Sequence, residues 1–119
     1  MLKHAPLSLA TDGSGNATAQ TPSSIAGTIH SFDWYGSGLA VGADLVITLV
    51  DTGAEVDKTL LTLTNTANSN KEYFARTLEQ SNVGVDLATY TEYVVMGKIK
   101  AVVAEGGAST VAKLIVYYY

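Results

Sequence analysis

Apolar and polar residues alternate with a period of two through most of the sequence, and this pattern limits the chain to β-strands. Neighbouring side chains of a strand point to opposite faces, so alternation buries one face and exposes the other. Clusters of Gly, Ser, Asn and Asp separate the alternating segments, as turns do. The 119-residue sequence therefore predicts one all-β domain over residues 1–119, a single-domain antiparallel β-sandwich or barrel-like (jelly-roll-like) fold with about eight strands.

The expected strands follow from these boundaries. They are Leu2–Ala10, Ala17–Thr21, Ser24–Tyr35, Asp44–Thr52, Lys58–Thr64, Lys71–Arg76, Tyr93–Ala104 and Thr110–Tyr118. The turn cluster 11–16 predicts a hairpin between the first two strands, and Gly106-Gly107 predicts one between the last two. A further turn is expected at Asp51–Ala54.

Two segments depart from simple alternation. The apolar positions of Ser24–Tyr35 change parity near His30–Ser31, which predicts a bulge or a bend between two sheets. Residues 77–90 show no sustained pattern, so we expect a long excursion over the surface. The only weak helix candidate in the chain is Tyr73–Glu79.

The composition argues against several classes of function. The sequence has no cysteine, which excludes disulfides, thiolate zinc sites and a thiol nucleophile. Its net charge is −4, with only 7 Lys and Arg residues, whereas binding to nucleic acid needs clustered cations. No apolar run is long enough for a signal peptide or a membrane span. We therefore expect a protein made in a cytoplasm that binds neither nucleic acid nor membrane.

Residue types suited to catalysis occur close together once, as His30, Ser31 and Asp33. Adjacent residues of a strand diverge, and the sequence contains no Gly-x-Ser-x-Gly nucleophile elbow. An ordinary strand with polar residues on its outer face is the better interpretation. We predict no catalytic residues and no enzyme activity.

Metal and phosphate sites are also not expected. The segment Asp12–Asn16 offers only two side-chain oxygens, too few for a calcium loop, so a tight turn is favoured. Asp51, Glu55 and Asp57 flank a turn and are interpreted as solvated. The two Gly-Ser-Gly segments lack the lysine and helix of a phosphate-binding loop. We predict no metal and no cofactor.

The aromatic residues are the strongest candidates for binding. Because Tyr117, Tyr118 and Tyr119 are consecutive, they cannot all face a core. Tyrosine is enriched at protein interfaces, so we predict an interface formed by Trp34, Tyr35, Tyr117, Tyr118 and Tyr119. Two alternatives remain: exposed tyrosines that are merely tolerated, and a sugar-stacking platform formed by Trp34 and Tyr35.

Charged residues make up only 15% of the chain. Soluble monomeric β proteins commonly protect their sheet edges with charge. A β domain whose outer positions are mostly Thr, Ser, Ala, Asn and Val is better explained if partners cover much of its surface. The composition thus favours a protein that works by assembly.

Several segments carry a resemblance to a protein group. They are Leu7–Thr18, Ile25–His30, Gly42–Thr48, Leu61–Asn65, Tyr73–Arg76 and Gly97–Gly107. Their sequence resembles a broad group of small proteins encoded near the major capsid gene in the structural gene clusters of tailed bacteriophages. The resemblance covers most of the chain, except for residues 65–70 and 77–90.

The resemblance implies a virion structural protein. Within that role we expect a capsid decoration or cement protein, bound to the major capsid protein or other virion proteins and assembled as a homo-oligomer such as a trimer. The alternatives are a head–tail connector, a tail or fibre protein and, from a different class, a carbohydrate-binding β-sandwich.

Overall fold

The computed structural model describes residues 1–50, 57–80 and 83–119, and this part of the chain contains ten β-strands and no helix. The strands are β1 (Lys3–Ala10), β2 (Ala17–Gln20), β3 (Ile25–Tyr35), β4 (Asp44–Val50), β5 (Lys58–Leu63), β6 (Asn70–Tyr73), β7 (Arg76–Gln80), β8 (Asp86–Glu92), β9 (Val94–Ala104) and β10 (Val111–Tyr118). Accordingly, no described segment is a helix capable of spanning a membrane.

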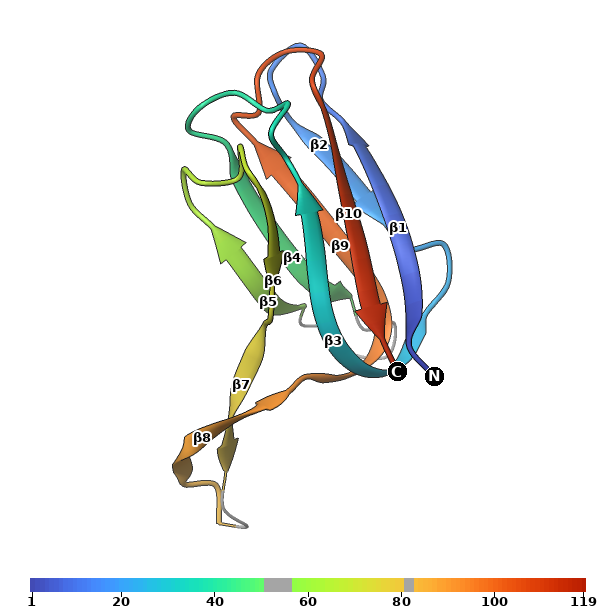
Figure 1. Ribbon diagram of the computed structural model, residues 1–119, viewed down its shortest axis with the longest axis vertical. Coiled ribbons are helices and arrows are strands. Elements are labelled where there is room, and N and C mark those ends of the chain that lie inside the picture. The colour runs from blue at the N-terminus through green and yellow to red at the C-terminus, as the bar shows by residue number, and fades with distance from the viewer. Residues whose placement is uncertain (51–56, 81–82) are drawn as a thin grey trace.

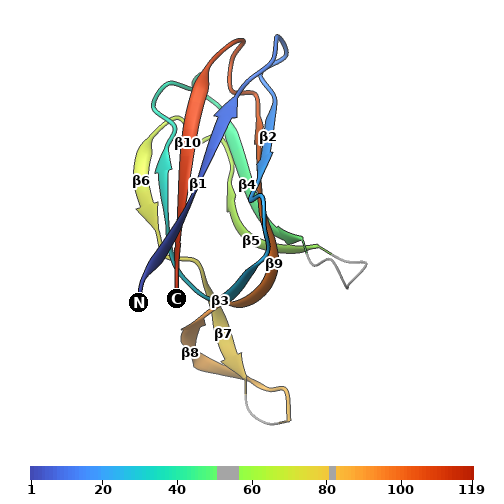
Figure 2. The same ribbon diagram turned by 90° about the vertical axis from the view of Figure 1, so that its right-hand side faces the viewer.

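Eight of these strands form two layers packed face to face (Figures 1 and 2). Hydrogen bonds join them in the order β1-β10-β3-β9-β4-β5, with β6 added beside β3 and β2 beside β9. Strands β1, β10 and β6 lie in the first layer, and β2, β4 and β5 lie in the second. All pairings are antiparallel. The predicted antiparallel β-sandwich is confirmed.

The core between the layers follows the predicted alternation most closely in β10 and β4. Ala112, Leu114 and Val116 of β10 are buried, and so are Leu45, Ile47 and Leu49 of β4. Strand β4 lies between β9 and β5, as expected for a strand that is apolar on both faces. In β5 a register shift opposite Ile47 and Thr48 breaks the alternation, so Leu60 and Leu63 are the buried residues. The turn expected at Asp51–Ala54 lies outside the described residues.

Strands β3 and β9 connect the layers because each passes from one to the other. The first part of β3, residues 25–28, pairs with β9, whereas residues 29–35 pair with β10. The register shifts where Ile29 and Ser31 face Tyr118 and Tyr117, which confirms the bend predicted near His30–Ser31. Such bends are how strands change sheets at the corner of a sandwich.

Two glycines permit close backbone contacts at this corner. Gly27 lies against the carbonyl of Tyr119, and Gly97 lies against the carbonyl of Val50. Their φ angles are 153° and 157°, which L side chains rarely adopt. Beside Gly27, Thr28 and Tyr119 exchange two backbone hydrogen bonds of 3.2 and 2.9 Å, which attach the end of β10 to β3.

The two turns predicted to close hairpins instead connect opposite layers. Strand β1 pairs with β10 and β2 pairs with β9, so neither the first nor the last expected hairpin forms. The turns pack on each other: Gly106 N donates to Gly15 O at 2.9 Å, and the Thr11 hydroxyl donates to Gly107 O at 2.6 Å. Glycine-rich turns suit both connections, so their sequence does not distinguish a hairpin from an arch between sheets.

Strands β7 and β8 form a projecting hairpin, which we call the arm. Strands β7 and β8 pair with each other in a separate two-stranded sheet and leave the sandwich at the end where both termini lie (Figures 1 and 2). The radius of gyration is 14.8 Å, against about 13.5 Å for a compact chain of this length. The arm adds the strands beyond the predicted eight, and the helix candidate Tyr73–Glu79 is wrong.

The close contact at Gly27 gives a test of the corner. A Cβ at residue 27 would overlap the Tyr119 carbonyl, so Gly27→Ala should lower the free energy of unfolding by about 2 kcal/mol or more. Gly13 has open space around it, and Gly13→Ala is the matched control, with an expected change within about 0.5 kcal/mol. Urea denaturation measures both. Equal stabilities of the two variants would contradict this account of the corner.

Candidate functional site

The side chain of Trp34 belongs to the core. It is 1% exposed, and its indole Nε1 donates to the Ala67 carbonyl at 2.7 Å. Ala67 N in turn donates to Ala43 O, so the loop at 65–70 is fixed by this tryptophan. The prediction that Trp34 offers an interface or a sugar platform is corrected: the even positions of β3 face inward in this half of the strand. A buried tryptophan needs a partner for its N–H, and the loop supplies it.

Tyr35 lies on the opposite face of the first layer and is 45% exposed. The same side of the sheet carries Asp33 on β3, Glu72 on β6 and Tyr117 on β10, and it also carries Lys113 and Ile115 of β10, which lie opposite Tyr35 and Asp33. We call Tyr35, Asp33, Glu72 and Tyr117 the acid–tyrosine face. The register places Asp33 opposite Glu72 and Tyr35 opposite Asn70. Residues far apart in the sequence therefore present two aromatic rings and two carboxylates on one side of one sheet.

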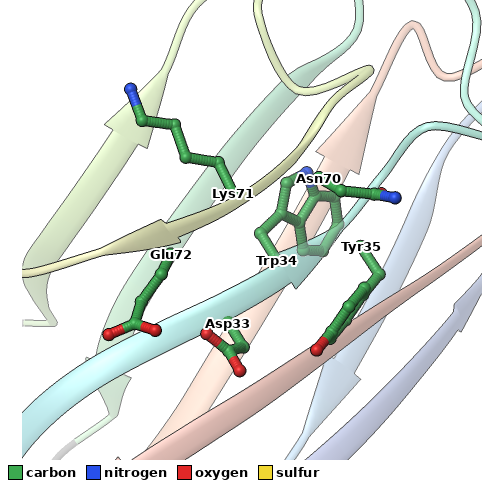
Figure 3. Close-up of a pocket in the computed structure, with 6 residues that line it drawn as sticks. All are labelled: Asp33, Trp34, Tyr35, Asn70, Lys71 and Glu72. Atoms are coloured by element: carbon green, nitrogen blue, oxygen red, sulfur yellow. The ribbon is translucent and has the colours of Figure 1, made fainter.

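A hollow of about 210 Å³ opens at the edge of this face. Its lining residues, drawn in Figure 3, are Asp33, Trp34, Tyr35, Asn70, Lys71 and Glu72. Pockets that enclose a small molecule usually measure about 300 Å³ or more. The hollow can therefore seat part of a ligand, and the rest would lie across the acid–tyrosine face.

Tyr117 is electrostatically coupled to this face. Burial raises its pKa above the ordinary value of 10.0, and the negative charges of Asp33 and Glu72 raise it further. On its other side the ring of Tyr117 tilts against His4 of β1, with the ring centres 6.5 Å apart. Tyr117 is half-buried, so its ring extends the face beyond the hollow.

The other two C-terminal tyrosines point elsewhere. Tyr118 packs against the core, with the Lys3 ammonium 5.9 Å from the ring centre. Tyr119 is 49% exposed and makes an edge contact with His30, which also contacts Phe74. The five residues predicted as one interface are thus separated: Tyr35 and Tyr117 share a face, Tyr119 lies near the arm, and Trp34 and Tyr118 support the fold.

Arg76 holds the root of the arm. Its guanidinium Nη1 donates to the His30 carbonyl at 3.0 Å, and its charged group lies 5.5 Å from the ring centre of Phe74. Nη2 is 4.0 Å from the Glu92 carboxylate across the hairpin. These contacts attach the arm to β3 through polar groups and one ring, with little core beneath it.

Large apolar residues follow one another along the arm and the strand that leaves it. Tyr90, Val94 and Met96 are 67%, 76% and 72% exposed and share one parity along the chain. We call these three the apolar stripe. Single exposed apolar residues are ordinary, whereas a group of them is a candidate interaction surface. Tyr90 was missed because the irregular pattern of residues 77–90 hid the hairpin, and Val94 and Met96 were not singled out within the expected strand Tyr93–Ala104.

The residues considered for chemistry take structural roles. Ser31 is 2% exposed, and its hydroxyl contacts His30 Nδ1 at 3.0 Å. Asp12 Oδ1 accepts from the backbone N–H groups of Asn16 and Ser14 at 3.0 and 2.8 Å, which lowers its pKa and closes a tight turn. Within residues 1–50, 57–80 and 83–119, no three His, Cys, Asp or Glu side chains gather as metal ligands. Asp51 and Glu55 lie outside that part.

Comparison with known proteins supplies a fold but no family. No family model matches the sequence, and neither does any curated protein. Among solved structures, chitosan-binding module 1 of a chitosanase/glucanase from Paenibacillus sp. IK-5 is similar, with a TM-score of 0.53 and 11% identity over 94% of this chain and 76% of that one. The fold is a β-sandwich. At this identity the likeness establishes nothing more.

Two other similar structures are also carbohydrate-binding modules. The family 32 module of AlyQ, in complex with 4,5-unsaturated mannuronic acid, has a TM-score of 0.47 and 14% identity over 94% of this chain and 77% of that one. A carbohydrate-binding module of family 29 has a TM-score of 0.45 and 13% identity over 91% of this chain. The chain spans 62% of the length of that family 29 module.

The raised pKa of Tyr117 gives a testable pH dependence. Up to about pH 10 the folded and unfolded chains both keep this proton, so its contribution to stability is constant. Above that pH the unfolded chain releases the proton first, so stability falls until the folded pKa is passed. Ultraviolet titration should show a late tyrosine ionisation that Tyr117→Phe abolishes and Asp33→Asn moves to lower pH. A spectrum unchanged by both variants would contradict the assignment.

Proposed function

We propose that this protein is a structural component of a tailed-phage virion, most specifically a decoration or cement protein of the head. Its partners are the major capsid protein and further copies of itself. The observation that carries the proposal is the projecting arm together with the apolar stripe, in which Tyr90 on the arm and Val94 and Met96 at the adjoining start of β9 are 67%, 76% and 72% exposed. The sequence resemblance to small proteins encoded near capsid genes supports the same role.

The arm suits this role for a physical reason. It leaves the sandwich at one end, so it can cross to a neighbouring subunit while the core stays intact (Figure 1). Apolar surface buried at about 25 cal/mol per Å² stabilises each contact modestly. Many copies on one particle convert modest contacts into firm attachment through avidity. Tyr119 and Phe74, both about half exposed, lie at the same end and extend the contact region.

Binding to particles tests the proposal. Tyr90→Asp and Val94→Asp place charges in the apolar stripe and should weaken binding to heads that lack this protein at least about tenfold, because charged groups lose solvation in an apolar contact. Val41→Asp is the matched control, because Val41 is 90% exposed in the loop between β3 and β4 at the other end of the sandwich. A sedimentation assay measures the bound fraction.

Copy number and oligomeric state complete this test. Decoration predicts a copy number comparable to that of the major capsid protein, whereas a connector forms a single ring. Light scattering on the isolated protein should give the mass of a small oligomer such as a trimer. A monomer that does not bind particles would contradict the proposal, as would stripe variants that bind like Val41→Asp.

Carbohydrate binding is the second candidate function. The specific observation in its favour is the hollow beside the exposed ring of Tyr35, lined by carboxylate and amide groups. Aromatic rings stack on the apolar faces of sugars, and carboxylate and amide oxygens accept hydrogen bonds from hydroxyl groups. A solved structure of similar fold is a chitosan-binding module, which is compatible with this role.

A glycan array tests the second candidate. If the hollow binds sugar, Tyr35→Ala should abolish the signal, since stacking on this ring is lost. Tyr119→Ala is the matched control, because Tyr119 is similarly exposed, 49% against 45%, but lies away from the acid–tyrosine face. Absence of any glycan signal from the parent protein, or equal loss in both variants, would exclude the site.

A further inference from the structure

The two carboxylates that line the hollow, Asp33 and Glu72, lower the stability of the sheet by their position. Asp33 and Glu72 are directly opposed on neighbouring antiparallel strands, and their side chains project to the same side of the sheet (Figure 3). Like charges directly opposed across a strand pair destabilise a sheet. An edge strand of four residues has no structural need for this pairing. Residues that destabilise their own strand pairing in this way are found mainly at functional sites.

The nearby cations do not neutralise this pair. Lys71 lines the hollow, but its side chain points away from the carboxylates, and its ammonium lies 5.5 Å from the ring centre of Tyr73 (Figure 3). Lys113 is exposed on the same side of the sheet, opposite Tyr35 and two register positions from the pair of Ile115 with Asp33. Among the described residues, the ion pairs within 4.0 Å involve neither Asp33 nor Glu72. The hollow therefore presents negative charge to a ligand.

We infer that the hollow discriminates between glycans by charge, taking a neutral or amino sugar and rejecting sugars that carry acid groups. This inference rests on the carbohydrate-binding candidate function and specifies its ligand. The ring of Tyr35 offers the stacking surface, and Asn70 offers an amide donor and acceptor. The Asp33 and Glu72 carboxylates accept hydrogen bonds from hydroxyl or ammonium groups. Carboxylates have no proton to donate, so the acid group of a uronic acid or sulfated sugar gains no hydrogen bond from Asp33 or Glu72 and is repelled by both.

The hollow is smaller than a whole glycan. It can seat part of a glycan, and the adjoining sugar then lies toward Tyr117 on β10. The negative charges of Asp33 and Glu72 extend to Tyr117, because they raise the pKa of its hydroxyl. A second acidic sugar over Tyr117 would meet the same field, so the rejection should increase with the number of acid groups.

Titration calorimetry with three hexasaccharides tests the inference: a glucose hexamer, a glucosamine hexamer and a galacturonic acid hexamer. At low salt the first two should bind, and the galacturonate should bind at least about tenfold more weakly, a difference of about 1.4 kcal/mol, because its acid groups are repelled by the unscreened carboxylates. Raising the salt concentration should narrow the difference, since salt screens exposed charges.

The double variant Asp33→Asn/Glu72→Gln keeps the shape of the hollow and removes its charge. Galacturonate binding should rise in this variant to within about threefold of neutral hexamer binding, a difference of under 1 kcal/mol. Loss of folding is not expected; removing the opposed charges should raise the urea midpoint. Glu105→Gln, an exposed carboxylate in the β9–β10 turn, is the matched control and should retain the discrimination.

The possible results distinguish charge discrimination from carbohydrate binding itself. If none of the three hexamers binds, carbohydrate binding fails and the inference fails with it. If the hexamers bind but galacturonate binds as well as glucose or better, only the inference is overturned. An unchanged preference in the double variant would also overturn it, because the carboxylates would then not be its source.

Discussion

The close approach of backbone at two glycines is the constraint on which the sandwich depends. Strands β3 and β9 each pair with strands of both layers. This is possible because Gly27 and Gly97 have no Cβ, so the carbonyls of Tyr119 and Val50 can pack directly against them. The bend at this corner changes the parity of β3, so its first half directs Ile25 and Ile29 into the core while its second half directs Phe32 and Trp34 there. The acid–tyrosine face exists because the alternate residues then face outward.

Trp34 links this core to the hollow. Its indole hydrogen bond to Ala67 fixes the loop that leads into β6, and β6 carries Asn70 and Glu72 to positions opposite Tyr35 and Asp33. Gly36 leaves room for this arrangement, because a Cβ there would overlap both the Ala67 carbonyl and the indole nitrogen. Buried Trp34 therefore determines where Asn70 and Glu72 lie on the surface. This structural role explains why the tryptophan is in the core.

The sequence predicted the parts of the fold that depend on local pattern. Alternation predicted strands β4 and β10, and the parity change near His30 located the corner. Strand partners were predicted wrongly at both glycine-rich turns. The sequence of a turn indicates that the chain reverses direction, but it does not indicate which sheet the next strand joins. Of the acid–tyrosine face, only Tyr35 and Tyr117 were predicted as binding residues, whereas Asp33 had been considered only for catalysis. Asp33 and Glu72 meet through the pairing of β3 with β6, strands far apart in the sequence, and no local pattern encodes such a contact.

The attachment of the arm through Arg76 has a consequence for how the protein can diversify. Because the arm's described apolar side chains lie outside the core, substitutions there are not constrained by packing between the layers. Substitutions in the arm can thus change its exposed surface while leaving the thermodynamic stability of the sandwich nearly constant. The surface of the arm and the stability of the core can therefore be selected separately.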